Sequence, residues 1–211
     1  MQVDFLDSHK DFAMCFHPVN MVFTDGEMPS RIWPKNIGES YTQEDILYTN
    51  IIPSCTVMFR NGLVDEFPDW YYSLKTEDWS LYVLLTQHGK IGFMNVATAV
   101  YRVHSRGVWS SQEDVVKLLE DIKFYDCMKL HFGKKYRNMI RARLDEYYYK
   151  LALLYEDTNE NDIAKKYAQK CLFINPLLSQ TKLISKTKMV FRLYFPLLYK
   201  FIKANNFKLA K

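Results

Sequence analysis

The chain has 211 residues, of which 48% are hydrophobic and 16% aromatic, and it contains only 7 glycines and 7 prolines. This composition excludes a disordered or low-complexity protein and allows one large domain or two small ones. The four cysteines are widely spaced, with no CxxC pair and no histidine at zinc-finger spacing. They predict reduced thiols in a cytoplasmic protein.

The net charge of +4 hides two parts of opposite sign. Residues 163–211 contain eleven of the 28 basic residues and none of the 24 acidic ones, whereas residues 1–162 have a net charge of −7. A mildly acidic body followed by a strongly basic tail predicts that the tail meets an anionic surface.

The first half of the chain is predicted to mix strands and helices. Its opening residues have the apolar spacing of the end of an amphipathic helix, and the Asp25-Gly26 pair is a common hairpin turn signal. Strands are expected in 12–27, 54–60 and 89–105, a loop in 28–50, and a helix in 79–87. Thr76 is the expected N-cap of that helix, with Glu77 and Asp78 in its first turn.

The second half is predicted to be helical. Apolar residues recur at helical spacing in 113–131, 137–155 and 160–173, and Ser111 is the expected cap of the first of these helices. The change of character places a domain boundary near residue 112, which gives domains 1–112 and 113–211.

The second and third of these helical patterns look like one tetratricopeptide-type helix hairpin. The features are Ala152, Ala164, Ala168 and a closing Asn175-Pro176 pair. Small residues at helix crossings also serve ordinary packing, and a stable array needs about three repeats. An ordinary helix hairpin is therefore the alternative.

The apolar run from Met189 to Ile202 is interrupted by Arg192 and Lys200. It is too short and too charged for a membrane span, which needs about 20 apolar residues. We expect an interfacial helix instead, with residues 182–211 on a membrane surface and the protein peripheral on the inner face of the membrane. The alternative is a terminal helix that packs on the body.

Three segments of the first half share their order with a known family. They are CTVMFRN (55–61), TEDWSLYVLLTQHGKIGFM (76–94) and VYRVHSRGVWS (100–110). The chain resembles the acceptor-side half of a family 2 glycosyltransferase over about residues 1–112. The shared order is a strand ending in Arg-Asn, an acidic-Asp-Trp helix start, a Gly-Lys-Ile-Gly turn and a Tyr-Arg-x-His-x-x-Gly-x-Trp-Ser segment. The resemblance implies an α/β fold, with a partial GT-A (Rossmann-like) mixed sheet before the helical region.

The resemblance also implies an activity, which is inverting transfer of a hexosyl group from a nucleotide-sugar donor to a glycan or lipid-linked saccharide. Asp78 falls in the position of the general base, which takes the proton of the attacking hydroxyl. Glu77, Trp79 and Arg60 fall on the acceptor side. By local physics alone, the better explanation of both carboxylates is that they complement a helix dipole, and Arg60 is explained as the end of a strand.

The same resemblance implies donor contacts near the end of the first half. Arg102, Arg106 and Trp109 would lie on the segment that closes over the donor diphosphate, and His104 falls where some relatives place a metal contact. A divalent metal, Mn or Mg, is expected in the complete enzyme. One histidine is not a metal site by itself, so a structural role is the alternative for His104.

One departure from the family pattern concerns the donor site. The nucleotide-binding half and its Asp-x-Asp motif would precede these segments, and the chain contains neither an Asp-x-Asp nor a glycine-rich phosphate loop. The nearest patterns, Asp25–Glu27 and Glu160–Asp162, lie in a predicted turn and a helix start. We therefore expect a C-terminal portion of a longer or split enzyme, inactive alone, with a missing N-terminal half as its partner.

Two other classes of function are open from the sequence. The chain would serve as a non-catalytic interaction module or membrane-surface scaffold if the helical hairpin and basic tail bind a partner while the first domain is only a scaffold. Nucleic-acid binding through the tail is disfavoured because the tail is rich in apolar residues, so no nucleic-acid partner is expected.

Overall fold

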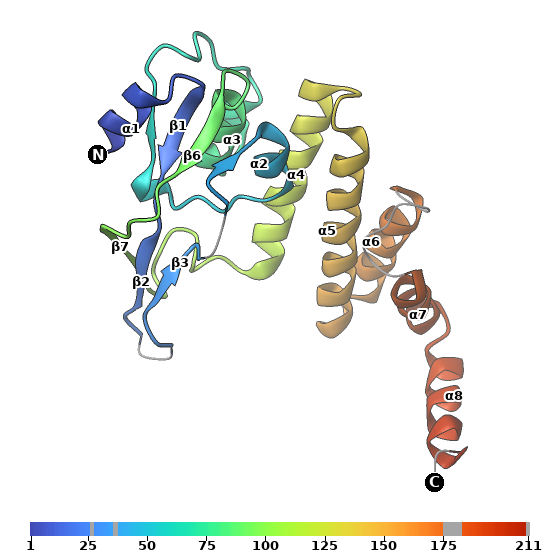
Figure 1. Cartoon of the computed structure of the whole chain (residues 1–211). Helices are drawn as coiled ribbons and strands as arrows, with labels where there is room; N and C mark the ends of the chain where they lie inside the picture. The colour runs from blue at the N-terminus through green and yellow to red at the C-terminus, as the bar shows by residue number, and fades with distance from the viewer. Residues whose placement is uncertain (26–27, 36–37, 175–182, 210–211) are drawn as a thin grey trace. The chain divides into compact units, whose positions relative to one another are not determined.

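The computed structural model of the chain describes residues 1–25, 28–35, 38–174 and 183–209, with side chains described up to residue 202. These residues form eight α-helices and two small mixed sheets, which confirms the α/β class (Figure 1). The chain divides into two compact units, Met1–Glu113 and Asp114–Lys211. Both sheets lie in the first unit, and the described part of the second unit contains helices only.

The larger sheet has four strands in the order β4-β6-β1-β5. They are β1 (Phe12–Phe16), β4 (Ser40–Tyr41), β5 (Met58–Phe59) and β6 (Lys90–Phe93). β1 and β6 run parallel, whereas β5 pairs antiparallel with β1 and β4 pairs antiparallel with β6. Four consecutive residues of β1, from Ala13 to Phe16, are buried, as expected for a central strand covered on both faces.

The smaller sheet has three strands in the order β3-β2-β7. They are β2 (Val19–Phe23), β3 (Arg31–Trp33) and β7 (Ala99–Val103). β2 pairs antiparallel with β3 and parallel with β7, so each of the strand regions predicted at 12–27 and 89–105 is divided between the two sheets. The first division falls at His17-Pro18, because proline has no N–H to donate to a neighbouring strand.

The helices of the first unit are short, and one of them lies where a loop was expected. They are α1 (Gln2–Ser8), α2 (Gln43–Tyr48) and α3 (Glu77–Leu85), with 3-10 turns η1 (Ser54–Thr56) and η2 (Tyr71–Ser73). The loop prediction for 28–50 is wrong, because the segment contains β3, β4 and α2. A capping box begins α2, in which the Thr42 amide donates to Asp45 Oδ2 at 2.8 Å. The strand prediction for 54–60 holds only for β5.

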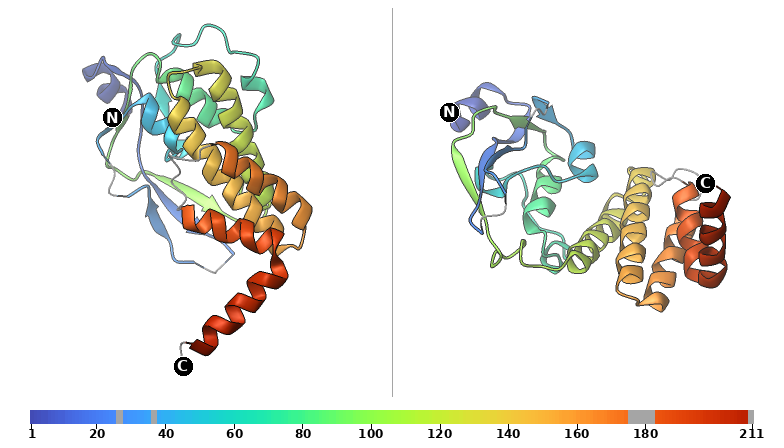
Figure 2. Two further views of the ribbon diagram at one scale, coloured as in Figure 1. Left: turned by 90° about the vertical axis from the view of Figure 1, so that its right-hand side faces the viewer. Right: turned by 90° about the horizontal axis from the view of Figure 1, so that it is seen from below.

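The second unit contains α4 (Asp114–Phe132), α5 (Arg137–Asp157), α6 (Asn161–Ile174), α7 (Leu183–Tyr194) and α8 (Pro196–Leu209). The three long helical predictions are confirmed. Ser111 does not cap α4, because the helix begins three residues later, at Asp114. α5, α6 and α7 pack together through Ala152, Ala164, Ala168 and two apolar residues of α7, Met189 and Leu193 (Figure 2). Small side chains let these helices approach closely.

The apolar run 189–202 is divided between α7 and α8 by Phe195-Pro196. Proline suits the first position of a new helix because that position needs no N–H donor. α7 is part of the packed body, so the packing alternative describes it correctly. No helix in the described part of the chain is long and apolar enough to cross a membrane. Of the tail predicted on a membrane, 182–211, residues 182, 210 and 211 lie outside the described residues.

A buried ion pair joins three helices of the second unit. Lys186 of α7 is 2% exposed and pairs with Asp145 of α5, which is fully buried. The thiol of Cys171, on α6, donates to the same Asp145 oxygen at 3.2 Å. Burial and the Asp145 charge raise the pKa of the Cys171 thiol to about 12, so the thiol is neutral. Lys186, part of the basic tail in the sequence, is therefore an interior residue.

A second polar cluster lies between α4 and α5. Arg143 is buried and donates to Tyr147 Oη at 3.0 Å and to Glu146. Loss of solvent raises the pKa of Asp121 to about 6, although a hydrogen bond with Tyr147 and the Arg143 charge oppose that shift. The folded protein therefore binds a proton at Asp121 more tightly than an unfolded chain does.

Because its pKa rises on folding, Asp121 is expected to make the second unit less stable as the pH rises from about 4 to about 6. Asp121→Asn should remove this loss and raise the free energy of unfolding above pH 7 by about 1–3 kcal/mol. Urea unfolding followed by circular dichroism at pH 4.5 and pH 7.5 measures the free energy of unfolding of the native protein and the variant. Asp157→Asn, at an exposed position, is the control. Equal shifts at both pH values would contradict the assignment.

Candidate active site

The buried side chain of Trp79 anchors the first turn of α3 to the core. The indole is 4% exposed, and its Nε1 donates to the carbonyl oxygen of Ile46 in α2 at 2.7 Å. Thr76 occupies the N-cap position as predicted, but its hydroxyl makes no capping hydrogen bond. Trp79 is thus a core residue that positions the helix start, and its predicted contact with an acceptor stays a prediction.

Asp78 stands at the surface of this turn. One of its carboxylate oxygens, Oδ1, accepts a hydrogen bond from the Trp79 amide at 2.7 Å. Although the side chain reaches solvent, the protein packed around the carboxylate raises the pKa of Asp78, and the negative charge of Glu77 adds to the shift. The bond to Trp79 opposes it. A carboxylate with raised proton affinity at the surface suits a general base, and its bond to a first-turn amide also suits a helix cap.

Two further side chains that the sequence did not single out, Tyr82 and Tyr71, interact with Asp78. Tyr82 lies one turn along α3 and is 2% exposed. Burial raises the pKa of Tyr82, and the charges of Asp78, Cys55 and Tyr71 add to that shift. Cys55 belongs to η1, which packs against β7.

A cluster of four aromatic rings precedes α3, at Phe67, Trp70, Tyr71 and Tyr72. Tyr71 is central to it, with ring centroids 4.5 Å from Phe67, 6.4 Å from Trp70 and 5.5 Å from Tyr72. The side chain of Tyr72 is 73% exposed. The charges of Glu77 and Asp78 contribute to a raised pKa of Tyr71, which places the cluster beside the carboxylates. The signal in the sequence was four aromatics within six residues.

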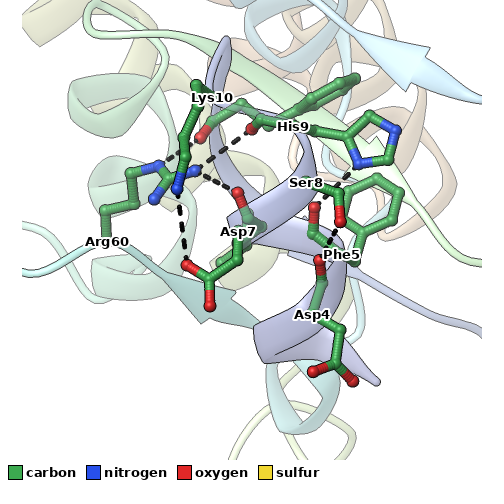
Figure 3. A network of polar contacts seen from close by, with 9 residues as sticks. Asp4, Phe5, Asp7, Ser8, His9, Lys10 and Arg60 are labelled. Atoms are coloured by element: carbon green, nitrogen blue, oxygen red, sulfur yellow. Dashed lines mark hydrogen bonds and ion pairs between the residues drawn. The ribbon is translucent and has the colours of Figure 1, made fainter.

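Arg60 holds the end of α1 (Figure 3). Its Nε donates to the carbonyl oxygen of Phe12 at 2.8 Å, and its Nη2 donates to those of Leu6 and His9. These carbonyls belong to the C-terminal turn of α1 and the start of β1, where a positive charge complements the helix dipole. The guanidinium is directed at α1 and has a structural role there. Its predicted contact with an acceptor stays a prediction.

The segment after β7 folds into consecutive turns. The carbonyl of His104 accepts hydrogen bonds from the Gly107 amide at 3.1 Å and from Ser110 Oγ at 2.6 Å. Within and just before these turns, Arg102, Arg106 and Trp109 have exposed side chains. Because these three side chains are exposed, they are accessible to a ligand. Their predicted contacts with a donor stay predictions.

The residues near His104 do not form a metal site by themselves. Asp25 is the nearby acid, and its Oδ2 accepts the Ser105 amide at 2.6 Å, which lowers the pKa of Asp25. In the described residues no group of three or more histidine, cysteine, aspartate or glutamate side chains could hold a metal ion. Glu27, in the Asp25–Glu27 pattern, lies outside the described residues. The metal contact predicted at His104 therefore stays a prediction.

No protein-family model matches the chain. Curated proteins of Mycobacterium bovis and of two strains of Mycobacterium tuberculosis, each named only as an uncharacterized protein, are 31% identical to it over 110 residues. That stretch is 52% of this chain and 31% of each relative, so the chain spans about a third of the length of the curated relatives it matches. The chain is thus similar over about half its length to one part of larger mycobacterial proteins.

Proposed function

We propose that the first unit is the acceptor-side part of a family 2 glycosyltransferase with the GT-A fold. It would take part in inverting transfer of a sugar from a nucleotide-sugar donor to a glycan or lipid-linked saccharide. The observation that carries the proposal is the surface carboxylate Asp78, with its raised pKa, beside an aromatic cluster in which the ring of Tyr72 is exposed. A base and an apolar platform are the two parts that an acceptor sugar requires.

In the proposed reaction, Asp78 takes the proton of the acceptor hydroxyl as that oxygen attacks the anomeric carbon. The new carbon–oxygen bond forms while the bond to the diphosphate breaks, so the diphosphate leaves with the electron pair and the configuration inverts. The raised pKa of Asp78 favours proton transfer, because a base is most effective when its pKa approaches the working pH. Burial is the main cause of that raised pKa, and repulsion from Glu77 adds to it.

The aromatic cluster would hold the acceptor. Sugar rings present C–H groups on one face, and these pack on aromatic rings, while their hydroxyls reach polar groups at the edge. Tyr72 offers an exposed ring and Tyr71 connects it to the carboxylates. Arg102, Arg106 and Trp109 are kept in the proposal as the segment that meets the donor diphosphate. The donor site, with its divalent cation, is assigned to a further N-terminal half.

The second unit is proposed to contribute a tetratricopeptide-like hairpin formed by α5 and α6. Support comes from Ala152, Ala164 and Ala168, all fully buried where these helices pack. One hairpin cannot form a repeat array, so the proposal is limited to a similar pair of helices that serves as a rigid support.

The acceptor proposal is tested by titrating the chain with disaccharides of glucose, galactose and N-acetylglucosamine, followed by NMR. Shifts are expected in residues 67–82 with at least one sugar, and Tyr72→Ala should weaken that binding about fivefold, because ring stacking contributes roughly 1 kcal/mol. Phe173→Ala is the matched control, since that ring is 80% exposed on α6.

The same titration with UDP and manganese tests the donor assignment separately. The chain alone is expected to show no binding, because the donor site is assigned to another half. Binding of UDP would overturn that assignment and leave the acceptor proposal standing. Absence of any sugar-induced shift in residues 67–82 would overturn the acceptor proposal.

A further inference from the structure

Helix α8 carries a row of exposed apolar side chains. Leu197 is 82% exposed, Phe201 65%, Leu198 48% and Ile202 42%. Their spacing of one, four and five residues places them on one face of the helix. Four large apolar side chains on one face form a continuous strip, whereas isolated exposed apolar residues are ordinary.

The strip faces away from the contacts that join α8 to α7. Tyr199 makes those contacts, with its ring centroid 6.3 Å from that of Phe191 and a hydrogen bond to Arg192. Arg192 in turn pairs with Glu156 of α5, which connects the start of α8 to the packed helices. On a helical wheel, the centre of the strip lies about 130° from residue 199, at 100° per residue. One face of α8 therefore contacts α7, and the strip lies on another face.

The charge around the strip has one sign. Lys200 on α8 and Lys188 on α7 are exposed. No acidic residue follows Asp162 in the sequence, although two other cations of α7, Lys186 and Arg192, are paired with Asp145 and Glu156 of α5. An apolar strip on a helix that has an exposed lysine and no acidic residue in its sequence matches a surface that is apolar inside and anionic outside.

The length of α8 decides how it would meet such a surface. The helix has 14 residues, which at 1.5 Å per residue is about 21 Å. The hydrocarbon core of a bilayer is about 30 Å thick, so α8 is too short to cross it. A helix of this kind lies in the plane of the headgroups with its apolar side chains in the acyl boundary.

We propose that α8 binds the surface of an anionic lipid membrane, with Leu197, Leu198, Phe201 and Ile202 inserted and lysines at the headgroups. The binding is independent of sugar transfer and would bring the first unit to lipid-linked acceptors. A partner protein with an acidic groove is the other occupant that such a helix fits, and the vesicle experiment distinguishes the two; α8 extends from the end of α7 (Figure 1).

The test is co-sedimentation of the full chain with phosphatidylcholine vesicles that contain or lack phosphatidylserine. The chain is expected to sediment with the anionic vesicles and to be released by high salt. Phe201→Glu combined with Leu197→Glu should lower binding more than about tenfold, because two inserted side chains become charged. Lys200→Glu should weaken binding to the anionic vesicles only.

Phe173→Glu is the matched control, because it places the same charge at an exposed ring of α6 and should bind like the unaltered chain. Circular dichroism confirms that all variants remain folded. The proposal is overturned if the double variant sediments like the unaltered chain, or if both vesicle types bind equally. It is also overturned if the double variant instead dissociates a dimer in size-exclusion chromatography without changing sedimentation.

Discussion

Replacement of Asp78 by asparagine is expected to lower the turnover of sugar transfer by about 10²–10⁴-fold, because the variant cannot take the proton of the acceptor hydroxyl. The assay is product formation from a nucleotide sugar by this chain joined to a donor-binding half. Asparagine keeps the size of the side chain and an oxygen that can accept the Trp79 amide, which is 2.7 Å away in the native residue. Stability should therefore change little.

The pH dependence of the rate shows whether Asp78 acts as a general base or only as a helix cap. The rate of the native protein should rise with pH as Asp78 loses its proton, over a range above that of an ordinary aspartate because its pKa is raised. The asparagine variant should lose that rise. Glu77→Gln, the adjacent control, should lower the pKa of Asp78 and shift the rise to lower pH with turnover largely kept. A variant at Asp78 with near-normal turnover would disprove the base assignment.

Removal of Asp145 by Asp145→Ala is expected to destabilise the second unit by about 3–5 kcal/mol, because it leaves the ammonium of Lys186 buried without its counter-charge. Lys186 is 2% exposed and Asp145 is fully buried, so neither charge reaches water in the folded protein. Thermal unfolding followed by circular dichroism measures the loss. Lys188→Met, at an exposed position two residues away on α7, is the control and should change stability little.

The double variant Asp145→Leu with Lys186→Met tests the cause. If the loss comes from an unpaired buried charge, the double variant should be more stable than Asp145→Ala, since neither charge remains. A double variant that is less stable than Asp145→Ala would contradict this explanation. That result would indicate that the two side chains stabilise the fold through their packing volume, with Cys171 as a neighbour of both groups.

The long helices were predictable because their signal is local. α4, α5 and α6 begin and end within two residues of the predicted 113–131, 137–155 and 160–173. Apolar spacing over many turns determines such helices. The short elements were not predictable in the same way. α2 has only 6 residues, and its capping box, Thr42 with Asp45, is too brief a signal to outweigh the polar sequence around it.

The sequence predicted that 12–27 and 89–105 form strands, but it did not predict that each segment divides into two strands. One apolar run, 12–27, gives β1 in one sheet and β2 in the other, and the run 89–105 gives β6 and β7 likewise. The alternation of a strand is the same in either sheet, so the pattern cannot show where the chain passes between them. Pairing of β1 with β6 and of β2 with β7 is decided by partners more than 70 residues apart.

The candidate site shows the same limit. The sequence placed Asp78 in the first turn of a helix, and that placement is confirmed. It could not show that Trp79 lies in the core, that Arg60 reaches α1, or that Tyr82 and Tyr71 interact with Asp78. The aromatic cluster was visible only as composition. Each of these outcomes depends on which side of an element faces inward.

By itself, the sequence determined that this chain is an α/β protein with a helical second part, because apolar periodicity and helix starts are encoded within a few residues. It also determined the basic excess beyond Asp162, since charge needs no structure to be counted. Only the tertiary structure decided which of those charges are interior. Lys186 pairs with Asp145, 41 residues away, and Arg192 with Glu156, 36 residues away. Contacts at such separations follow from packing, which no local pattern specifies.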